Sequence, residues 1–174
     1  SVANRMGFTG ALLHILFDAF TMACLFMAAG AVMHKTGETS IHGFRRLHRR
    51  MPLTMAAFSI AALSAIGVPP FAGFFSKWYL VLGAIDAGKW IFAVLLLLSS
   101  LLIAIAFFRV IENIYFAPSD HAHNGVGQEE IVRDETPLSM LVPILTMAAG
   151  ILILGFFSGK IVSAVIQFTV PGGF

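Results

Sequence analysis

Cysteine and charge are what this sequence has least of. Its single cysteine, Cys24, excludes a disulfide framework and any iron–sulfur or zinc site built from several cysteines. Charged residues make up only 11% of the 174 residues, whereas 58% are hydrophobic, and the mean hydropathy is +0.88. Soluble domains have more charged and fewer hydrophobic residues than this, so the composition predicts an integral membrane protein. We expect no cofactor or metal and, despite a pI near 9.0, no nucleic-acid partner, because the cations gather beside an apolar run.

The N-terminus lacks the features of a start or of a targeting segment. It begins Ser1-Val-Ala-Asn-Arg5, without an initiator methionine and without a basic region, short apolar stretch and cleavage site. We therefore expect residues 1–174 to form a single membrane domain that is part of a longer or split subunit. Any redox chemistry of such an assembly is expected to lie outside this chain.

The apolar runs predict an all-α polytopic membrane fold with four transmembrane spans. A hydrocarbon core of about 30 Å takes about 20 helical residues per crossing. A short apolar tail, residues 161–170, is too short to cross and is predicted to lie at the membrane interface. The four predicted spans cover residues 7–34, 53–86, 91–116 and 138–157.

The second span is predicted to be a discontinuous helix. Its apolar stretch would make roughly 50 Å of straight helix, too long for one crossing and too short for two with a turn. Pro69 and Pro70 remove two backbone donors, and Gly67 and Gly73 permit non-helical angles around them. Irregular backbone at membrane depth needs protein or water to satisfy its polar groups, so this Gly-Val-Pro-Pro break indicates a transport pathway.

The distribution of cations predicts which side each loop occupies. Residues 35–50 hold five Lys/Arg and one acid, and residues 118–137 hold one Arg and five acids. With one broken span these loops share a side and hold six Lys/Arg against three opposite, so both are predicted to be cytoplasmic. If the two halves of the broken stretch crossed separately, the basic side would hold seven Lys/Arg against two on the other side. The charge rule mildly prefers this alternative. Each half would measure only about 21 Å, so helix length favours the single broken span.

Lys77 is the charged residue that stands deepest in an apolar, aromatic segment. It lies four residues past Gly73, between Phe74-Phe75 and Trp78-Tyr79. A lysine near the bilayer midplane costs about 2.5–3.5 kcal/mol on insertion scales, so it must face a polar cavity or a partner. Lys77 is therefore predicted to load and release a proton. The alternative is that Lys77 reaches an interface and only anchors the helix.

A second polar group is predicted on the first span. His14 and Asp18 are four residues apart and share one helix face, which Thr21 extends by a further three residues. A carboxylate beside a histidine inside a membrane predicts a proton relay. The alternative is a structural hydrogen bond within the pair or to a neighbouring helix.

The other histidines give weaker signals. His34 lies twenty residues from His14, some 30 Å along the helix, so the two cannot ligate one haem within it. His121 and His123 form an H-x-H pair in an acidic loop, which is weak evidence for a metal site.

Three segments carry a resemblance to a known family. They are residues 14–34, residues 49–58, and residues 67–79, which read G-V-P-P-F-A-G-F-F-S-K-W-Y. The chain resembles the C-terminal part of the antiporter-like proton-channel subunits of respiratory complex I, Mrp-type cation/proton antiporters and membrane-bound hydrogenases. Within this family, the motifs most resemble those of the D component of the Mrp-type antiporters. The resemblance implies the last four of fourteen spans, with the basic loop cytoplasmic.

The resemblance also implies roles for individual residues. Lys77 matches the lysine of the family's second broken helix, in its terminal half-channel, and His14 matches a histidine of the preceding helix. The family pattern His-x-x-x-His-Ala-x-x-Lys departs here at Asp18 and Met22, so Asp18 is expected to titrate in place of the missing lysine. The expected proton pathway comprises Lys77, Asp18, His14, Thr21 and His34.

The expected function is proton or cation/proton translocation in a multi-subunit complex of a prokaryotic plasma membrane. The expected partners are other membrane subunits, the lipid bilayer and protons, with sodium left open. Two alternatives remain: a structural subunit with a degenerate channel, and a component of a sodium/proton exchanger that uses Asp18 as an ion ligand.

Overall fold

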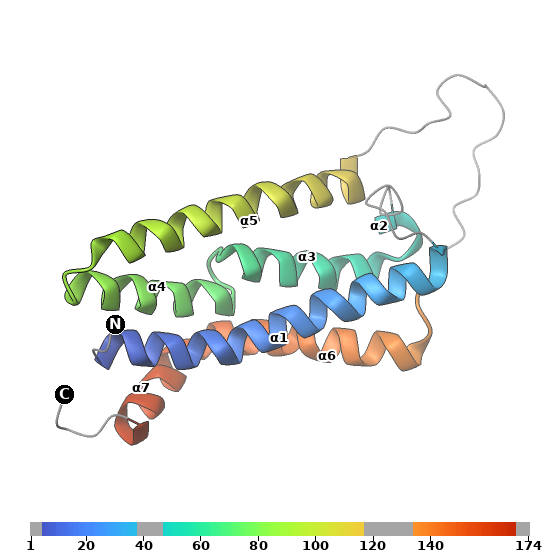
Figure 1. Ribbon diagram of the computed structural model, residues 1–174. Helices are drawn as coiled ribbons and strands as arrows, with labels where there is room; N and C mark the ends of the chain where they lie inside the picture. Colours follow the sequence, from blue (N-terminus) through green and yellow to red (C-terminus); the bar gives the residue numbers. More distant parts are fainter. Residues whose placement is uncertain (1–4, 38–46, 117–133, 170–174) are drawn as a thin grey trace.

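The computed structural model describes residues 5–37, 47–116 and 134–169, and the secondary structure of this part of the chain is entirely helical (Figure 1). The all-α prediction is therefore confirmed for the described residues. The helices are α1 (Arg5–Thr36), α2 (Leu47–Arg50), α3 (Pro52–Ile66), α4 (Ala72–Asp86), α5 (Trp90–Phe116), α6 (Leu138–Phe156) and α7 (Ser158–Thr169).

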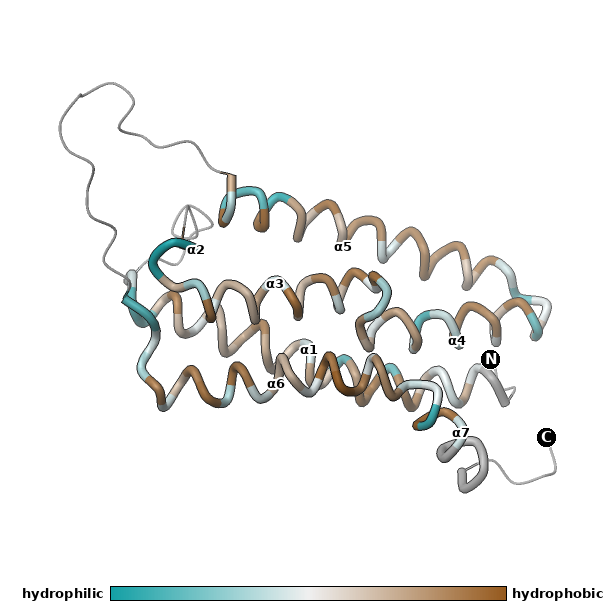
Figure 2. The backbone as a smooth tube through the Cα atoms, turned by 180° about the vertical axis from the view of Figure 1, so that it is seen from behind, coloured by the Kyte–Doolittle hydropathy of each residue, from teal (hydrophilic) through white to brown (hydrophobic). Residues whose placement is uncertain are grey.

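Within the described part of the chain, three helices are long and apolar enough to cross a membrane. They coincide with α1 from Gly7 to Thr36, with α5 and with α6. Their positions match three of the four predicted spans to within two residues. Figure 2 shows the apolar residues running along these helices and the most hydrophilic ones gathering near the ends. The protein is thus an integral membrane protein with transmembrane helices.

The second predicted span, residues 53–86, is divided into α3 and α4. Each has 15 residues, or about 22 Å of helix, and is shorter than the hydrocarbon core. The two follow one another along the length of α5, with the interruption between them halfway along the bundle (Figure 1). The predicted break is therefore present, although Gly73 already belongs to the first turn of α4 rather than to the interruption.

Contacts between segments place the two polar connections at one end of the bundle. Lys35, at the end of α1, forms an ion pair with Asp134, just before α6. His48 of α2 lies against the carbonyl oxygen of Ile114 near the end of α5, with 2.6 Å between Nδ1 and oxygen. Helix α4 ends at the opposite end of the bundle (Figure 1).

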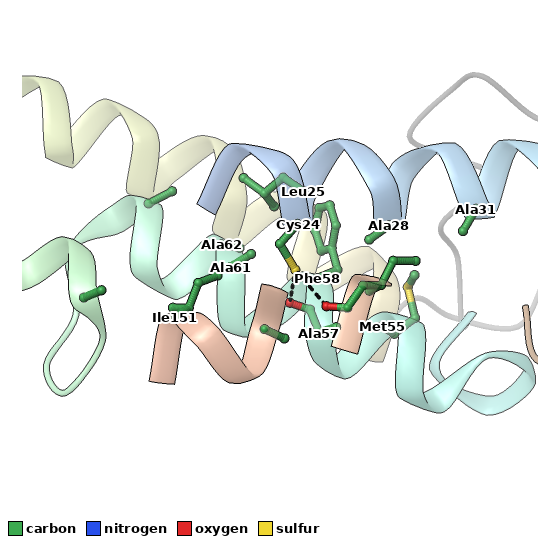
Figure 3. Close-up of a cluster of buried hydrophobic side chains, with 14 of the residues drawn as sticks. Cys24, Leu25, Ala28, Ala31, Met55, Ala57, Phe58, Ala61, Ala62 and Ile151 are labelled. Carbon is green, nitrogen blue, oxygen red and sulfur yellow. Dashed lines mark hydrogen bonds between the residues drawn. The ribbon is translucent and has the colours of Figure 1, made fainter. Parts of the chain in front are cut away.

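The core lies mainly between α1, α3 and α6 and combines many alanines with larger apolar side chains. Ala28 and Ala61 are completely buried, which lets the helix backbones approach closely. Cys24 lies among them, with its sulfur 3.7 Å from the carbonyl oxygens of Ala57 and Ile144 (Figure 3). In contrast, most of the large apolar side chains of α5 are exposed, as expected of a helix that faces lipid or another subunit.

The chain after α6 differs in detail from the predicted interfacial tail. Helix α6 ends at Phe156, and α7 begins at Ser158, three residues before the predicted start of the tail. Figure 1 shows α7 turning away from the direction of α6. Residues 170–174 lie outside the described part of the chain.

Candidate functional site

Lys77 lies one turn into α4 and reaches back across the helix break. Its Nζ donates hydrogen bonds to the carbonyl oxygens of Ala65 at 2.6 Å and Ile66 at 3.1 Å, the last two residues of α3. The side chain is half-buried. The lysine therefore neither reaches a distant interface nor faces a purely apolar wall, because it binds the backbone of the other half of the broken helix.

These carbonyls are available because of the way in which α3 ends. Gly67 has a φ of 93°, a left-handed conformation that glycine adopts without steric cost. The N–H of Gly67 donates to the carbonyls of Leu63 and Ser64, and the N–H of Val68 donates to the carbonyl of Leu63. This is the pattern of a Schellman motif. The carbonyls of Ala65 and Ile66 then remain without a backbone donor, and Lys77 supplies one. A cation at a helix C-terminus is also favoured by the helix dipole.

The start of α4 is held by a hydroxyl from α3. The backbone N–H of Gly73 donates to Oγ of Ser64 at 3.2 Å, and the same Oγ lies 3.1 Å from Oγ1 of Thr21 on α1. A Cβ on Gly73 would lie 1.9 Å from the carbonyl oxygen of Ser64, so only glycine permits this approach. Ser64 thus joins both halves of the broken helix to α1.

His14 of α1 contacts α4, the second half of the broken helix. Nδ1 of His14 lies 3.2 Å from Oγ of Ser76, whose hydroxyl donates to the carbonyl of Gly73 at 3.1 Å. Asp18 lies one turn further along α1 and interacts electrostatically with both His14 and Lys77. A cation, a carboxylate and an imidazole therefore share one site beside the break, which is an arrangement that can pass a proton.

Helix α6 closes the other side of the break. A Cβ on Gly155 would lie 2.4 Å from the carbonyl oxygen of Pro70, so the helix backbone and the break are in direct contact. The Pro69–Pro70 peptide bond in this segment is cis.

Four of the five residues predicted for the proton pathway come together here, namely His14, Asp18, Thr21 and Lys77. His34 does not join them, because it is exposed near the far end of α1. Its place in the pathway stays a prediction.

Sequence reasoning missed Ser64 and Ser76, which connect the predicted residues to the break. Both are buried, with exposed fractions of 1% and 0%. The available signal was a hydroxyl in an apolar run three residues from Gly67 or from Gly73, near a break where free backbone groups need partners.

The described residues contain no group of three or more His, Cys, Asp or Glu side chains that could hold a metal ion. His121 and His123 lie outside the described residues, so the H-x-H pair stays a weak prediction.

Comparison with protein families assigns the chain by sequence. Residues 1–103, more than half of it, match the family described as NADH:quinone oxidoreductase/Mrp antiporter, TM. The chain belongs to this family. The NADH:quinone oxidoreductase/Mrp match covers α1, α3, α4 and the first half of α5, and so contains the whole site around Lys77.

Curated relatives of the family extend the similarity to almost the whole chain. NADH-quinone oxidoreductase subunit N of Desulforudis audaxviator is 48% identical over 98% of this chain and 35% of that protein. The D component of the Na(+)/H(+) antiporter of Bacillus subtilis is 35% identical over 58% of this chain and 20% of that protein. The chain thus spans about a third or less of the length of these relatives.

Two solved structures share the fold of this chain. A chain of the Mrp complex from Dietzia sp. DQ12-45-1b superposes with a TM-score of 0.81 at 22% identity, covering 95% of this chain and 38% of that one. A chain of the membrane-bound sulfane sulfur reductase, an archaeal respiratory membrane complex, superposes with a TM-score of 0.77 at 27% identity. This match covers 93% of this chain and 31% of that one. The helix arrangement therefore belongs to a known architecture.

Proposed function

We propose that this chain forms a proton-translocating half-channel in a multi-subunit membrane complex, with Lys77 as the residue that takes up and releases the proton. One observation carries the proposal: the ammonium of Lys77 lies on two free carbonyls at a helix break inside an apolar bundle, next to Asp18 and His14. Membership of the NADH:quinone oxidoreductase/Mrp family supports it.

The hydrogen bonds of Lys77 suit a group that changes protonation. A protonated lysine has three N–H donors, and the carbonyls of Ala65 and Ile66 use two of them. A neutral amine keeps two N–H donors, so both carbonyls stay satisfied after the third proton leaves. Asp18 is an acidic group that interacts with Lys77, and an ionised carboxylate there attracts the ammonium.

The membrane arrangement that follows is a single domain of four spans, with α3 and α4 together forming one discontinuous span. Neither half is long enough to cross alone, and their end-to-end order along α5 supports one crossing (Figure 1). The five Lys/Arg of residues 35–50 favour a cytoplasmic position for that loop and, with one broken span, for residues 118–137, in a prokaryotic plasma membrane. The segment 161–170 lies at the interface.

The partners we propose are other membrane subunits, and the transported ions are protons, with sodium as a second ion to be tested. The exposed apolar face of α5 and the chain's coverage of only part of its relatives both favour contacts with further membrane helices. Sodium is included as a candidate ion because one relative is a component of an Na(+)/H(+) antiporter. We propose no cofactor and no redox step for this chain.

The test is proton uptake by vesicles that contain the purified complex. Lys77→Ala should reduce proton movement by about 100-fold, as expected for losing a positioned proton-transfer group. Because it also leaves the carbonyls of Ala65 and Ile66 without this donor, assembly of the variant complex is checked beside the transport assay. Lys77→Arg should also impair it, because a guanidinium stays protonated. Sodium dependence is measured in the same vesicles.

The matched control is Lys89→Ala, which removes an exposed lysine at the turn before α5 and should pump like the wild type. Asp18→Asn should be a milder lesion if Asp18 only tunes Lys77, and an equal one if it stores the proton. Wild-type pumping by Lys77→Ala would reject the transport role and favour a structural subunit.

A further inference from the structure

Ser76 is buried completely and contacts two acceptor-capable atoms on different elements. Its Oγ lies 3.1 Å from the carbonyl oxygen of Gly73 and 3.2 Å from Nδ1 of His14. A serine hydroxyl has one proton to donate and lone pairs with which to accept. A carbonyl oxygen only accepts, whereas an imidazole nitrogen does either, depending on the tautomer.

Only one assignment of protons makes both contacts attractive. If Ser76 donates to the carbonyl of Gly73, its lone pair is free to accept from an N–H at Nδ1 of His14. If Ser76 donated to Nδ1 instead, its oxygen would face the carbonyl oxygen at 3.1 Å without a proton between them. Ser76 lies in a buried position, so such a repulsive contact would be costly.

We propose that Ser76 is a positioning residue that fixes the proton of neutral His14 on Nδ1 and makes Nε2 the atom that exchanges protons. When Nε2 gains a proton, the imidazolium keeps the same Nδ1–H···Oγ hydrogen bond. His14 therefore changes charge without rotating its ring and without breaking its contact with α4.

The surroundings of His14 support this assignment of roles. The charged groups that interact with its ring are Asp18, on the same helix, and Lys77, on α4. Nδ1 is already committed to Ser76, so Nε2 is the ring atom left to exchange a proton with them, directly or through water. The proton-exchange role rests on the proposed function, whereas the tautomer itself does not.

The tautomer is measurable without any transport assay, by solid-state NMR of the complex labelled with ¹⁵N-histidine in lipid bilayers. The spectrum is recorded at about pH 9, well above the usual histidine pKa of about 6.5. The signal of His14 is identified by its loss in His14→Gln. The wild type should show a protonated Nδ1 and an unprotonated Nε2.

Ser76→Ala should lose this preference and show a population protonated at Nε2, while Ser76→Thr, which keeps a hydroxyl, should restore the wild-type spectrum. Ser59→Ala is the matched control, because Ser59 also donates to its own helix, at the carbonyl of Met55, but contacts Tyr115 instead of a histidine. It should leave the His14 signal unchanged.

A protonated Nε2 in the wild type at this pH would overturn the inference, as would an unchanged signal in Ser76→Ala. Neither result bears on Lys77, whose role is tested by proton uptake. Conversely, wild-type pumping by Lys77→Ala would reject the proposed function and leave the tautomer assignment to be decided by the spectrum.

Discussion

Gly73 lets the two halves of the broken helix touch, and its role predicts the effect of adding one methyl group. In Gly73→Ala the new Cβ would meet the carbonyl oxygen of Ser64 at 1.9 Å, and because this atom is backbone it cannot simply rotate away. We expect a loss of about 1–3 kcal/mol of stability, the usual cost of overpacking. Thermal unfolding of the purified protein in detergent measures it.

Gly30→Ala is the control for that substitution. Gly30 also lies in a helix, but a Cβ there would meet nothing within 4 Å. Alanine is the better helix former by about 0.5–1 kcal/mol, so this variant should unfold at the same or a higher temperature. Equal destabilisation of both variants would contradict the close approach at Gly73.

Individual residues of the site differed in how far the sequence revealed them. Lys77 and Asp18 were predictable because a charge inside an apolar run is costly and therefore conspicuous. Ser64 and Ser76 were not, because a serine in an apolar helix commonly bonds its own backbone, and only the folded chain shows which other helix its hydroxyl meets.

At the scale of elements, the N-terminus of α3 is capped from a distant segment. The position before the helix is Met51, which supplies no side-chain hydrogen bond. Oε1 of Glu135 takes its place and accepts from the backbone N–H of Thr54 at 2.9 Å and from its hydroxyl at 2.8 Å. A carboxylate at this end of a helix is also favoured by the dipole.

Glu135→Ala should therefore lower stability by about 1 kcal/mol, as the loss of a helix cap does. The neighbouring Asp134→Asn is the control, because Asp134 is exposed and its ion pair with Lys35 lies in solvent. Thermal unfolding compares the two. An equal or larger effect of Asp134→Asn would show that Glu135 is not the important cap.

The exposed ion pair also gives the direction of a pH effect. The hydrogen bond and the charge of Lys35 hold the pKa of Asp134 below its ordinary value near 3.8. Any stability that the pair contributes is therefore present above that value and is lost as the pH falls through the lowered pKa. Unfolding temperatures of Asp134→Asn and wild type should differ little at neutral pH and converge in acid.

Elements were predicted where the chain's own chemistry specifies them. The double proline with its glycines fixed the break between α3 and α4. The short helix α2 was missed inside the predicted polar loop, because Leu47 is buried only through contacts with other helices. The start of α7 at Ser158 was missed for a similar reason, since Gly159 and Lys160 resemble a loop in sequence.

At the scale of the whole molecule, the orientation in the membrane is testable with single cysteines. Cys24 is buried, so an impermeant thiol reagent should leave the wild-type chain in intact cells unlabelled. Ser40→Cys should also stay unlabelled, because the basic loop 35–50 is predicted to be cytoplasmic. Lys89→Cys, at the opposite end of the bundle, should react. The reverse pattern would invert the topology.

The contact between Gly155 and Pro70 has an electrical consequence. With α6 against the break, the backbone there has no room to move toward that helix, and we expect the proton-linked movement to be mainly that of the Lys77 side chain. Such a movement covers a few ångströms of a hydrocarbon core about 30 Å thick. Moving one elementary charge through the whole transmembrane potential changes the free energy by about 2.3 kcal/mol per 100 mV. The movement at Lys77 crosses only a small part of the membrane, so only a small fraction of this energy applies to it. The rearrangement at Lys77 should therefore depend only weakly on membrane voltage.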